Sequence, residues 1–166
     1  MRTFIWIFLV LISSTVIGQD AKAEIDSMLT KWHQSAANAQ FDAYFGLMDE
    51  DAVFIGTDPT EHWDCQAFKA FSKPYFDKGK AWSFSKLERH IFLNPQSTTI
   101  AWFDELLDTQ MGICRGSGVV IKTSSGWKIK HYVLSIAIPN ENVKEITALK
   151  KVFDTTLIEK LRAEKK

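Results

Sequence analysis

Hydrophobic positions in the first part of the chain recur at helical spacing. Between residues 22 and 39 they fall three, four and seven positions apart, which is the period of one helical face. A shorter run with the same period covers residues 41–48. Asp64 is a suitable N-cap for a third helix, which we expect Pro74 to kink or shorten and Gly79 to end. The apolar residues of the first run are Ile25, Met28, Leu29, Trp32, Ala36 and Ala39.

From Ala81 onward the hydrophobic period changes to two, which predicts β-strands. Short turns rich in Gly, Asn, Pro and Ser separate these strands, so we expect them to form an antiparallel meander. A last helix is predicted over residues 142–162, where apolar residues again have helical spacing. Helices followed by several antiparallel strands indicate an α+β fold. The expected strands span residues 52–55, 81–92, 98–107, 113–122 and 127–138.

Residues 1–18 resemble a targeting segment. Arg2 is their only charge, an apolar run continues through Ile12, and small residues precede a predicted cleavage after Gly18 that would leave Gln19 as the N-terminus. A membrane anchor is the alternative, although the apolar run is shorter than the roughly 20 residues that a spanning helix needs. We therefore expect a signal peptide and an exported protein, periplasmic or secreted, that does not associate with a membrane after cleavage.

Composition narrows the class of protein. The chain has 166 residues, of which 46% are hydrophobic, so an intrinsically disordered chain is excluded. Twenty basic residues balance 20 acidic ones, which argues against a general nucleic-acid binder. The two cysteines do not have zinc-ligand spacing, and we expect no metal and no cofactor. An exported compartment would permit a Cys65–Cys114 disulfide. The strand alternation, however, places Cys114 on the sheet face opposite the apolar stripe. We therefore do not expect the disulfide and expect two buried thiols.

The alternation along the strands suggests which polar residues lie beneath the helices. Arg115 and His131 share their faces with apolar neighbours, so we expect both on the covered face of the sheet. A buried Arg needs a carboxylate partner. Both faces of the strand over residues 98–107 are apolar, so alternation does not decide between Asp104 and Glu105, and we expect Asp104 to point inward beside Trp102. A structural role for an Arg–carboxylate pair and for a core His131 is the alternative to chemistry.

Several segments together carry a family resemblance. They are Y-F-G-L-M-D-E-D-A-V-F-I-G-T-D-P-T-E-H-W (44–63), A-W-F-D-E-L-L (101–107), R-G-S-G-V-V-I-K (115–122), G-W-K-I-K-H-Y-V-L-S (126–135) and I-P-N-E (138–141). Through them the chain resembles the nuclear transport factor 2-like superfamily, in its SnoaL-like branch. The resemblance implies a cone, in which a strongly curved antiparallel sheet wraps around a long N-terminal helix and leaves a pocket between them. It also implies a homodimer through the sheet.

The resemblance divides the chain into a SnoaL-like domain over residues 19–141 and a helical extension over residues 142–166. The superfamily includes ketosteroid isomerases, polyketide cyclases, dehydratases and many binding domains without catalytic activity. Its members therefore leave both a binding role and a catalytic role open for this chain.

Three functional hypotheses follow. The first is a binding module that takes a small, largely apolar molecule into the cone. The second is a cofactor-independent isomerase or cyclase that uses Asp104 and His131 as acid and base, with Arg115 fixing charge. The third is an interaction module that uses the helix over residues 142–166. The expected ligand-binding residues of the first hypothesis are Tyr44, Trp63, Trp102, Arg115 and His131.

Overall fold

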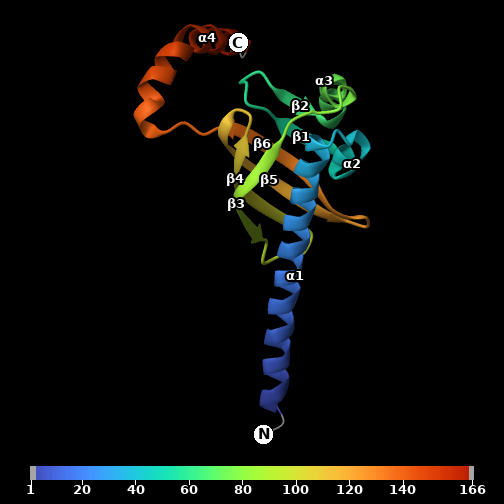
Figure 1. Cartoon of the computed structure of the whole chain (residues 1–166). Coiled ribbons are helices and arrows are strands. Elements are labelled where there is room, and N and C mark those ends of the chain that lie inside the picture. Colours follow the sequence, from blue (N-terminus) through green and yellow to red (C-terminus); the bar gives the residue numbers. More distant parts are fainter. Residues whose placement is uncertain (1–2, 165–166) are drawn as a thin grey trace. The chain divides into compact units, whose positions relative to one another are not determined.

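The computed structural model describes the backbone of residues 3–164 and the side chains of residues 20–164. The chain divides into two compact units, Met1–Ile136 and Ala137–Lys166 (Figure 1). The first unit contains all the strands and the first three helices, and the second contains the last helix.

Each helix predicted for the first unit is present, although the first begins at Thr3, well before residue 22, and the second ends at Gly46 instead of residue 48. The one that opens the chain, α1 (Thr3–Ala37), buries the predicted stripe, including Ile25, Leu29 and Trp32. The Asp64 side chain caps α3 by accepting a hydrogen bond of 2.7 Å from the Ala67 amide. The predicted signal peptide lies partly outside the described part of the chain. The structure describes its backbone from Thr3 onward and none of its side chains. The other helices of this unit are α2 (Phe41–Gly46) and α3 (Cys65–Asp77).

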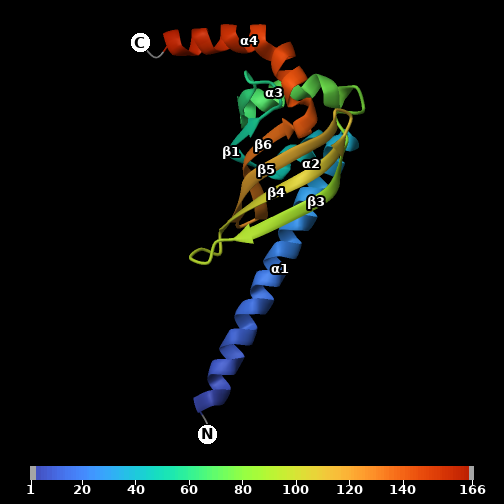
Figure 2. The same cartoon turned by 90° about the vertical axis from the view of Figure 1, so that its left-hand side faces the viewer.

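Six strands form one curved, unclosed sheet in the order β2-β1-β6-β5-β4-β3. Helix α1 runs across its concave face and contacts β3 and β6, so the predicted α+β fold with helices in a curved sheet is confirmed (Figures 1 and 2). The hydrophobic core lies between this helix and the sheet. The strands are β1 (Met48–Ile55), β2 (His62–Asp64), β3 (Phe84–Leu93), β4 (Ile100–Thr109), β5 (Gly112–Thr123) and β6 (Gly126–Ile136).

One strand pair departs from the expected antiparallel arrangement. β1 runs parallel to β6, whereas every other neighbouring pair of the described sheet is antiparallel. A parallel pair requires a long connection, and here the chain between the two strands forms β2, α3, β3, β4 and β5 before it returns. β1 is also longer than predicted, because the acidic run over residues 49–51 belongs to the strand. Two of its carboxylates, Asp49 and Asp51, pair with Lys130 of β6.

A β-bulge in β6 changes which residues face the helix. Val119 and Val120 of β5 pair with His131 and Ile129, so Lys130 is an extra residue that interrupts the alternation. Trp127 and Ile129 point inward before the bulge, and Tyr132 and Leu134 point inward after it. The strand therefore turns His131 away from the interior, and the alternation predicted for the whole strand is wrong in its second half.

The faces of β5 are the reverse of those predicted. Cys114 is fully buried, whereas Arg115 is exposed. The interior face of β5 is formed by Cys114, Gly116, Gly118 and Val120, because the two glycines make room for large rings on the neighbouring strands. Both cysteines are buried free thiols, as expected, although Cys114 lies on the opposite face from the one predicted.

The second unit is a short 3₁₀ turn (Asn140–Asn142) followed by α4 (Val143–Ala163), which confirms the predicted last helix. Its apolar residues are not buried: Leu149 and Val152 are each 80% exposed. Lys160 and Arg162 lie in its last turn, where the helix dipole favours positive charge. Of the helices in the described chain, none combines the length and apolarity that crossing a membrane requires.

Candidate functional site

A buried carboxylate lies at the centre of the concave face. Glu105 on β4 is 1% exposed, and both of its oxygens are occupied. Oε1 accepts hydrogen bonds of 2.9 Å from the His33 Nε2 atom and from the Tyr132 hydroxyl. Oε2 accepts a hydrogen bond of 2.8 Å from the Arg89 Nε atom, and a second guanidinium nitrogen lies 2.6 Å away. Both nitrogens approach the same oxygen, and the contact through Nε is a charge-assisted hydrogen bond, which is stronger than one between neutral groups.

The same arginine connects the sheet to α1. The Arg89 Nη1 atom donates to the Asp26 carboxylate at 2.9 Å, to the Asp26 carbonyl oxygen at 3.0 Å and to the Thr30 hydroxyl at 3.1 Å. The guanidinium group is almost completely buried, with 1% of its side chain exposed. Glu105 and Asp26 both lie close to the guanidinium group and balance its buried charge.

The surroundings of Glu105 keep it ionised. Burial by itself raises the pKa of this carboxyl, but the hydrogen bond and charge of His33 and the charge of Arg89 outweigh burial and lower the pKa below its usual value. Burial, reinforced by the Glu105 charge, raises the pKa of Tyr132 well above its usual value. In the hydrogen bond between Glu105 and Tyr132, the ionised carboxylate is therefore the acceptor and the neutral phenol is the donor. Neither group is accessible to solvent.

An open cleft lies beside this cluster, where β4 turns into β5. It has a volume of about 340 Å³, and α3, the segment over residues 81–84 and the loop over residues 56–61 form most of its walls. Six of its lining residues are aromatic. The lining residues are Phe54, Gly56, Thr57, Glu61, Phe68, Phe71, Tyr75, Ala81, Trp82, Phe84, Gln110, Met111 and Leu134.

One layer of aromatic rings separates the cleft from the buried cluster. Phe54, which lines the cleft, stacks on Tyr132 with 5.6 Å between ring centroids. Phe84, also in the cleft wall, meets the His33 ring edge-on at 5.8 Å. A molecule in the cleft would therefore touch aromatic rings, while Glu105 lies behind them.

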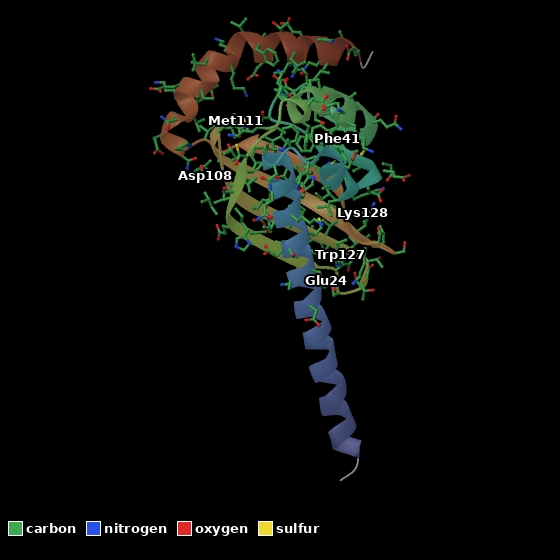
Figure 3. The ribbon with its side chains drawn as sticks, turned by 45° about the vertical axis from the view of Figure 1, so that its right-hand side comes forward. Glu24, Phe41, Asp108, Met111, Trp127 and Lys128 are labelled. Carbon is green, nitrogen blue, oxygen red and sulfur yellow. The ribbon has the colours of Figure 1, made fainter. Side chains whose placement is uncertain are left out.

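A second cavity, of about 810 Å³, lies at the other end of the sheet. Its wall includes Trp127, whose indole nitrogen donates a hydrogen bond of 3.0 Å to Glu24 of α1. Figure 3 shows Glu24 and Trp127 together at this end, and Met111 of the aromatic cleft at the opposite end. Glu24 is also paired with Lys122 at 3.1 Å, so these two charges neutralise each other. The aromatic cleft is the more specific binding surface, because Trp127 is the only aromatic residue in the described wall of the second cavity.

The structure corrects the expected orientation of the predicted acid. Asp104 points to the outer face of the sheet, with 46% of its side chain exposed, and its carboxylate lies 3.0 Å from the Nδ1 atom of His90. The neighbouring Glu105 takes the interior position. His131 is half-buried on the outer face too, and Asp104 and His131 lie on strands that are not adjacent. Their assigned catalytic roles stay predictions, but these two side chains do not meet in the interior.

The predicted ligand-binding residues are also dispersed. Arg115 and Trp102 lie on the outer face, where Trp102 is 44% exposed and stacks on Phe92. Tyr44 is fully buried against Trp32. Trp63 stacks on Phe71 at 4.8 Å and so supports the cleft wall from outside its lining. None of these residues, and not His131, lines the aromatic cleft, and their binding roles stay predictions.

Sequence reasoning weighed Glu105 but preferred Asp104, and it missed Arg89 and the aromatic wall on α3. One signal for Glu105 was present: Asp104 shares its strand face with Asp108, and two charges on one face indicate the solvent side. The sequence of α3 also carries aromatic residues at helical spacing, because Phe71 and Tyr75 lie one turn apart. Arg89 gave no comparable signal, because its pairing with Glu105 depends on the register of β3 against β4.

No group of three or more His, Cys, Asp or Glu side chains within the described part of the chain is arranged to hold a metal ion. The buried cluster contains one His and one Glu close together, with an arginine that would oppose a bound cation.

The curved sheet over a long helix and the cleft between the sheet and α3 define a cone-shaped α+β domain of the ligand-pocket type. A family model described as "SnoaL-like domain" matches residues 25–139. The chain belongs to this family. No curated protein matches the chain.

Solved structures share this fold at low sequence identity. A nuclear transport factor 2-like protein of unknown function from Pseudomonas putida is 14% identical and has a TM-score of 0.61, with 75% of this chain and 92% of that chain covered. A nuclear transport factor 2-like protein from Cytophaga hutchinsonii is also 14% identical, with a TM-score of 0.58 and coverages of 70% and 98%. A domain of unknown function with a cystatin-like fold from Nostoc punctiforme is 16% identical, with a TM-score of 0.61 and coverages of 87% and 98%. At such identities the likeness shows the fold alone.

Proposed function

We propose that the protein is an exported binding module that holds a small, largely apolar molecule in the aromatic cleft. The observation that carries this proposal is the cleft itself, a space of about 340 Å³ in which six aromatic side chains line the wall. Pockets of about this size with mostly apolar walls and a few polar groups are typical of small-molecule sites. The polar groups available here are Thr57, Glu61 and Gln110.

The buried cluster favours binding over proton transfer at Glu105. A general base must reach the proton that it removes, and it needs a free lone pair and a suitable pKa. Glu105 is enclosed, its oxygens accept from three side chains, and its pKa is lowered rather than raised. These properties suit a residue that holds α1 to the sheet.

Ligand titration of the purified chain tests the proposal. A diverse set of small apolar and aromatic molecules is screened by tryptophan fluorescence and by melting temperature, because Trp82 lies in the cleft wall. Phe71→Ala should weaken the binding of any hit at least about tenfold, since a buried aromatic contact is worth on the order of 1–3 kcal/mol. Phe92→Ala on the outer face is the matched control and should bind normally. A screen without a single hit, or hits that Phe71→Ala does not affect, would contradict the proposal.

Export and self-association complete the proposed function. Export is supported by the sequence of residues 1–18 and by the core, whose first buried residue among the described side chains is Ile25. Intact mass of the protein from an expressing cell should correspond to a chain that begins at Gln19. A homodimer through the outer face of the sheet is supported by exposed apolar residues there, including Ile100, Trp102 and Ile113.

A further inference from the structure

The charge in the aromatic cleft is of one sign. Glu61 is the only carboxylate among the lining residues, and these residues include no Lys, Arg or His. The rest of the wall is aromatic or aliphatic apart from Thr57, Gln110 and the Tyr75 hydroxyl. An acidic or strongly electron-rich ligand would meet no positive group in this space. The complementary ligand is one that carries a positive charge.

The Glu61 carboxylate is held in place by the loop over residues 56–61. The Gly56 amide donates to the Glu61 carbonyl oxygen at 3.1 Å, and the Glu61 amide donates to the Asp58 carbonyl oxygen at 3.0 Å. One carboxylate oxygen, Oε2, accepts a hydrogen bond of 3.2 Å from the Asp58 amide. The described side chains give this carboxylate no ion-pair partner within 4.0 Å. Its charge is therefore positioned but not neutralised.

A glycine makes room for this carboxylate. A Cβ atom at Gly56 would lie 2.0 Å from Glu61 Oε2, so any larger residue would push the carboxylate out of its present position. Gly56 and Glu61 both line the cleft. Replacing Gly56 would therefore move the Glu61 carboxylate without removing its charge.

The aromatic wall adds a second source of attraction for a cation. The faces of aromatic rings are electron-rich and attract ammonium groups within about 6 Å. Two rings of the wall are exposed to a ligand, Phe71 with 37% and Tyr75 with 43% of the residue accessible. The Tyr75 ring attracts a cation within the protein itself, since the ammonium group of Lys78, which is not a lining residue, lies 5.9 Å from its centroid. Groups of aromatic rings are a known means of binding quaternary ammonium ligands.

We propose that the ligand of the aromatic cleft is an organic ammonium ion, with its alkyl-substituted nitrogen against the aromatic rings and its charge facing Glu61. The inference rests on the proposed binding function and names its ligand class. It assigns to Glu61 the selection of charge, and to the aromatic wall the binding of the apolar groups around the nitrogen.

The test compares a cation with an uncharged molecule of the same shape. Choline and its carbon isostere dimethylbutanol are titrated against the full chain, and binding is followed by tryptophan fluorescence and ligand-observed NMR. Choline should bind at least about fivefold more tightly than dimethylbutanol, as expected for a cation over aromatic rings. Glu61→Gln and Gly56→Ala should each remove most of this preference. Glu50→Gln, an exposed carboxylate outside the cleft, is the matched control and should keep it.

The outcomes separate the two proposals. Equal affinities for choline and dimethylbutanol, with both lost in Phe71→Ala, would overturn the ammonium inference and leave the binding function standing. Retention of the choline preference in Glu61→Gln would also overturn it. If neither compound binds and the wider screen gives no hit, the binding function fails and the inference fails with it. Since the trimethylammonium group also occurs as a lipid headgroup, sedimentation with phosphatidylcholine vesicles distinguishes a membrane-borne source from a soluble one.

Discussion

At the scale of single residues, two neighbouring carboxylates on β4 have opposite roles. Glu105 is enclosed and holds together His33, Tyr132 and Arg89, whereas Asp104 faces solvent and contacts His90. A buried ion pair costs free energy to desolvate, but removing one partner leaves the other charge uncompensated. The free energy of unfolding should therefore depend strongly on Glu105 and weakly on Asp104.

Glu105→Gln should lower the free energy of unfolding by about 3–5 kcal/mol, because Arg89 would remain buried without its full countercharge. Asp104→Asn, one position along the same strand, should change it by less than about 1 kcal/mol, the range of exposed ion pairs. Urea denaturation measures both values. In the double variant Arg89→Met/Glu105→Gln the loss should be smaller than the sum of the single losses, and strict additivity would contradict the assigned pair.

Glu105 also predicts how stability depends on pH. Burial raises the pKa of this carboxyl, but His33 and Arg89 lower it by more than burial raises it. The pKa in the folded protein therefore lies below the ordinary value of 4.5. A group whose pKa is depressed by folding stabilises the protein above its unfolded pKa, and this contribution is lost as the pH falls through the folded pKa. Unfolding free energy should thus decrease below about pH 4.5. Urea titrations at a series of pH values should show a shallower acid decrease in Glu105→Gln than in the natural chain.

At the scale of elements, β5 and β6 shape the interior through a pair of glycines and a bulge. Gly116 and Gly118 leave space on the concave side of β5 for the rings of Tyr132 and Phe103. The extra residue Lys130 changes the phase of β6, which brings the Tyr132 hydroxyl to Glu105. The small residues of β5 and the one-residue shift in β6 therefore position the Tyr132 hydroxyl for its hydrogen bond to Glu105.

Gly116→Ala should destabilise the fold by roughly 1–3 kcal/mol, as expected for overpacking in a closely packed interior. A Cβ atom there would lie 2.2 Å from the Tyr132 hydroxyl oxygen and 3.0 Å from the Glu105 side chain. Gly46→Ala is the control, because a Cβ atom at that position has open space around it and the backbone has no positive φ. Thermal unfolding compares the two, and similar melting temperatures would show that the contact at Gly116 is unimportant.

At the scale of the whole molecule, the chain consists of a domain with its own core and a separate helical unit. Every fully buried residue of the described hydrophobic core lies between Ile25 and Leu134, so the core does not draw on α4. Two apolar surfaces remain exposed, one on the outer face of the sheet and one on α4. Either surface is a candidate for self-association, and the two can be tested separately.

Trp102→Glu should convert the proposed dimer to a monomer, because a stable interface of this kind buries on the order of 1,200–2,000 Å² and excludes unpaired charge from its centre. Leu149→Glu places the same charge on α4 and should leave the dimer intact. Sedimentation equilibrium of both variants measures the mass. Dissociation by Leu149→Glu alone would favour the helix as the interaction module, and a natural chain that is monomeric would contradict self-association altogether.

The amino-acid sequence by itself determined the helices, most of the strands, the α+β class and the family, because hydrophobic period and turn residues are local properties of the chain. It did not determine which face of β4 is buried, since both faces are apolar, and it did not reveal the bulge at Lys130, which depends on how β6 pairs with β5. Tertiary structure decided these points, and with them the inward position of Glu105, the outward positions of Arg115 and His131, and the cleft formed by α3. The physical reason is that a one-residue shift in strand pairing exchanges the two faces, while the local pattern stays the same.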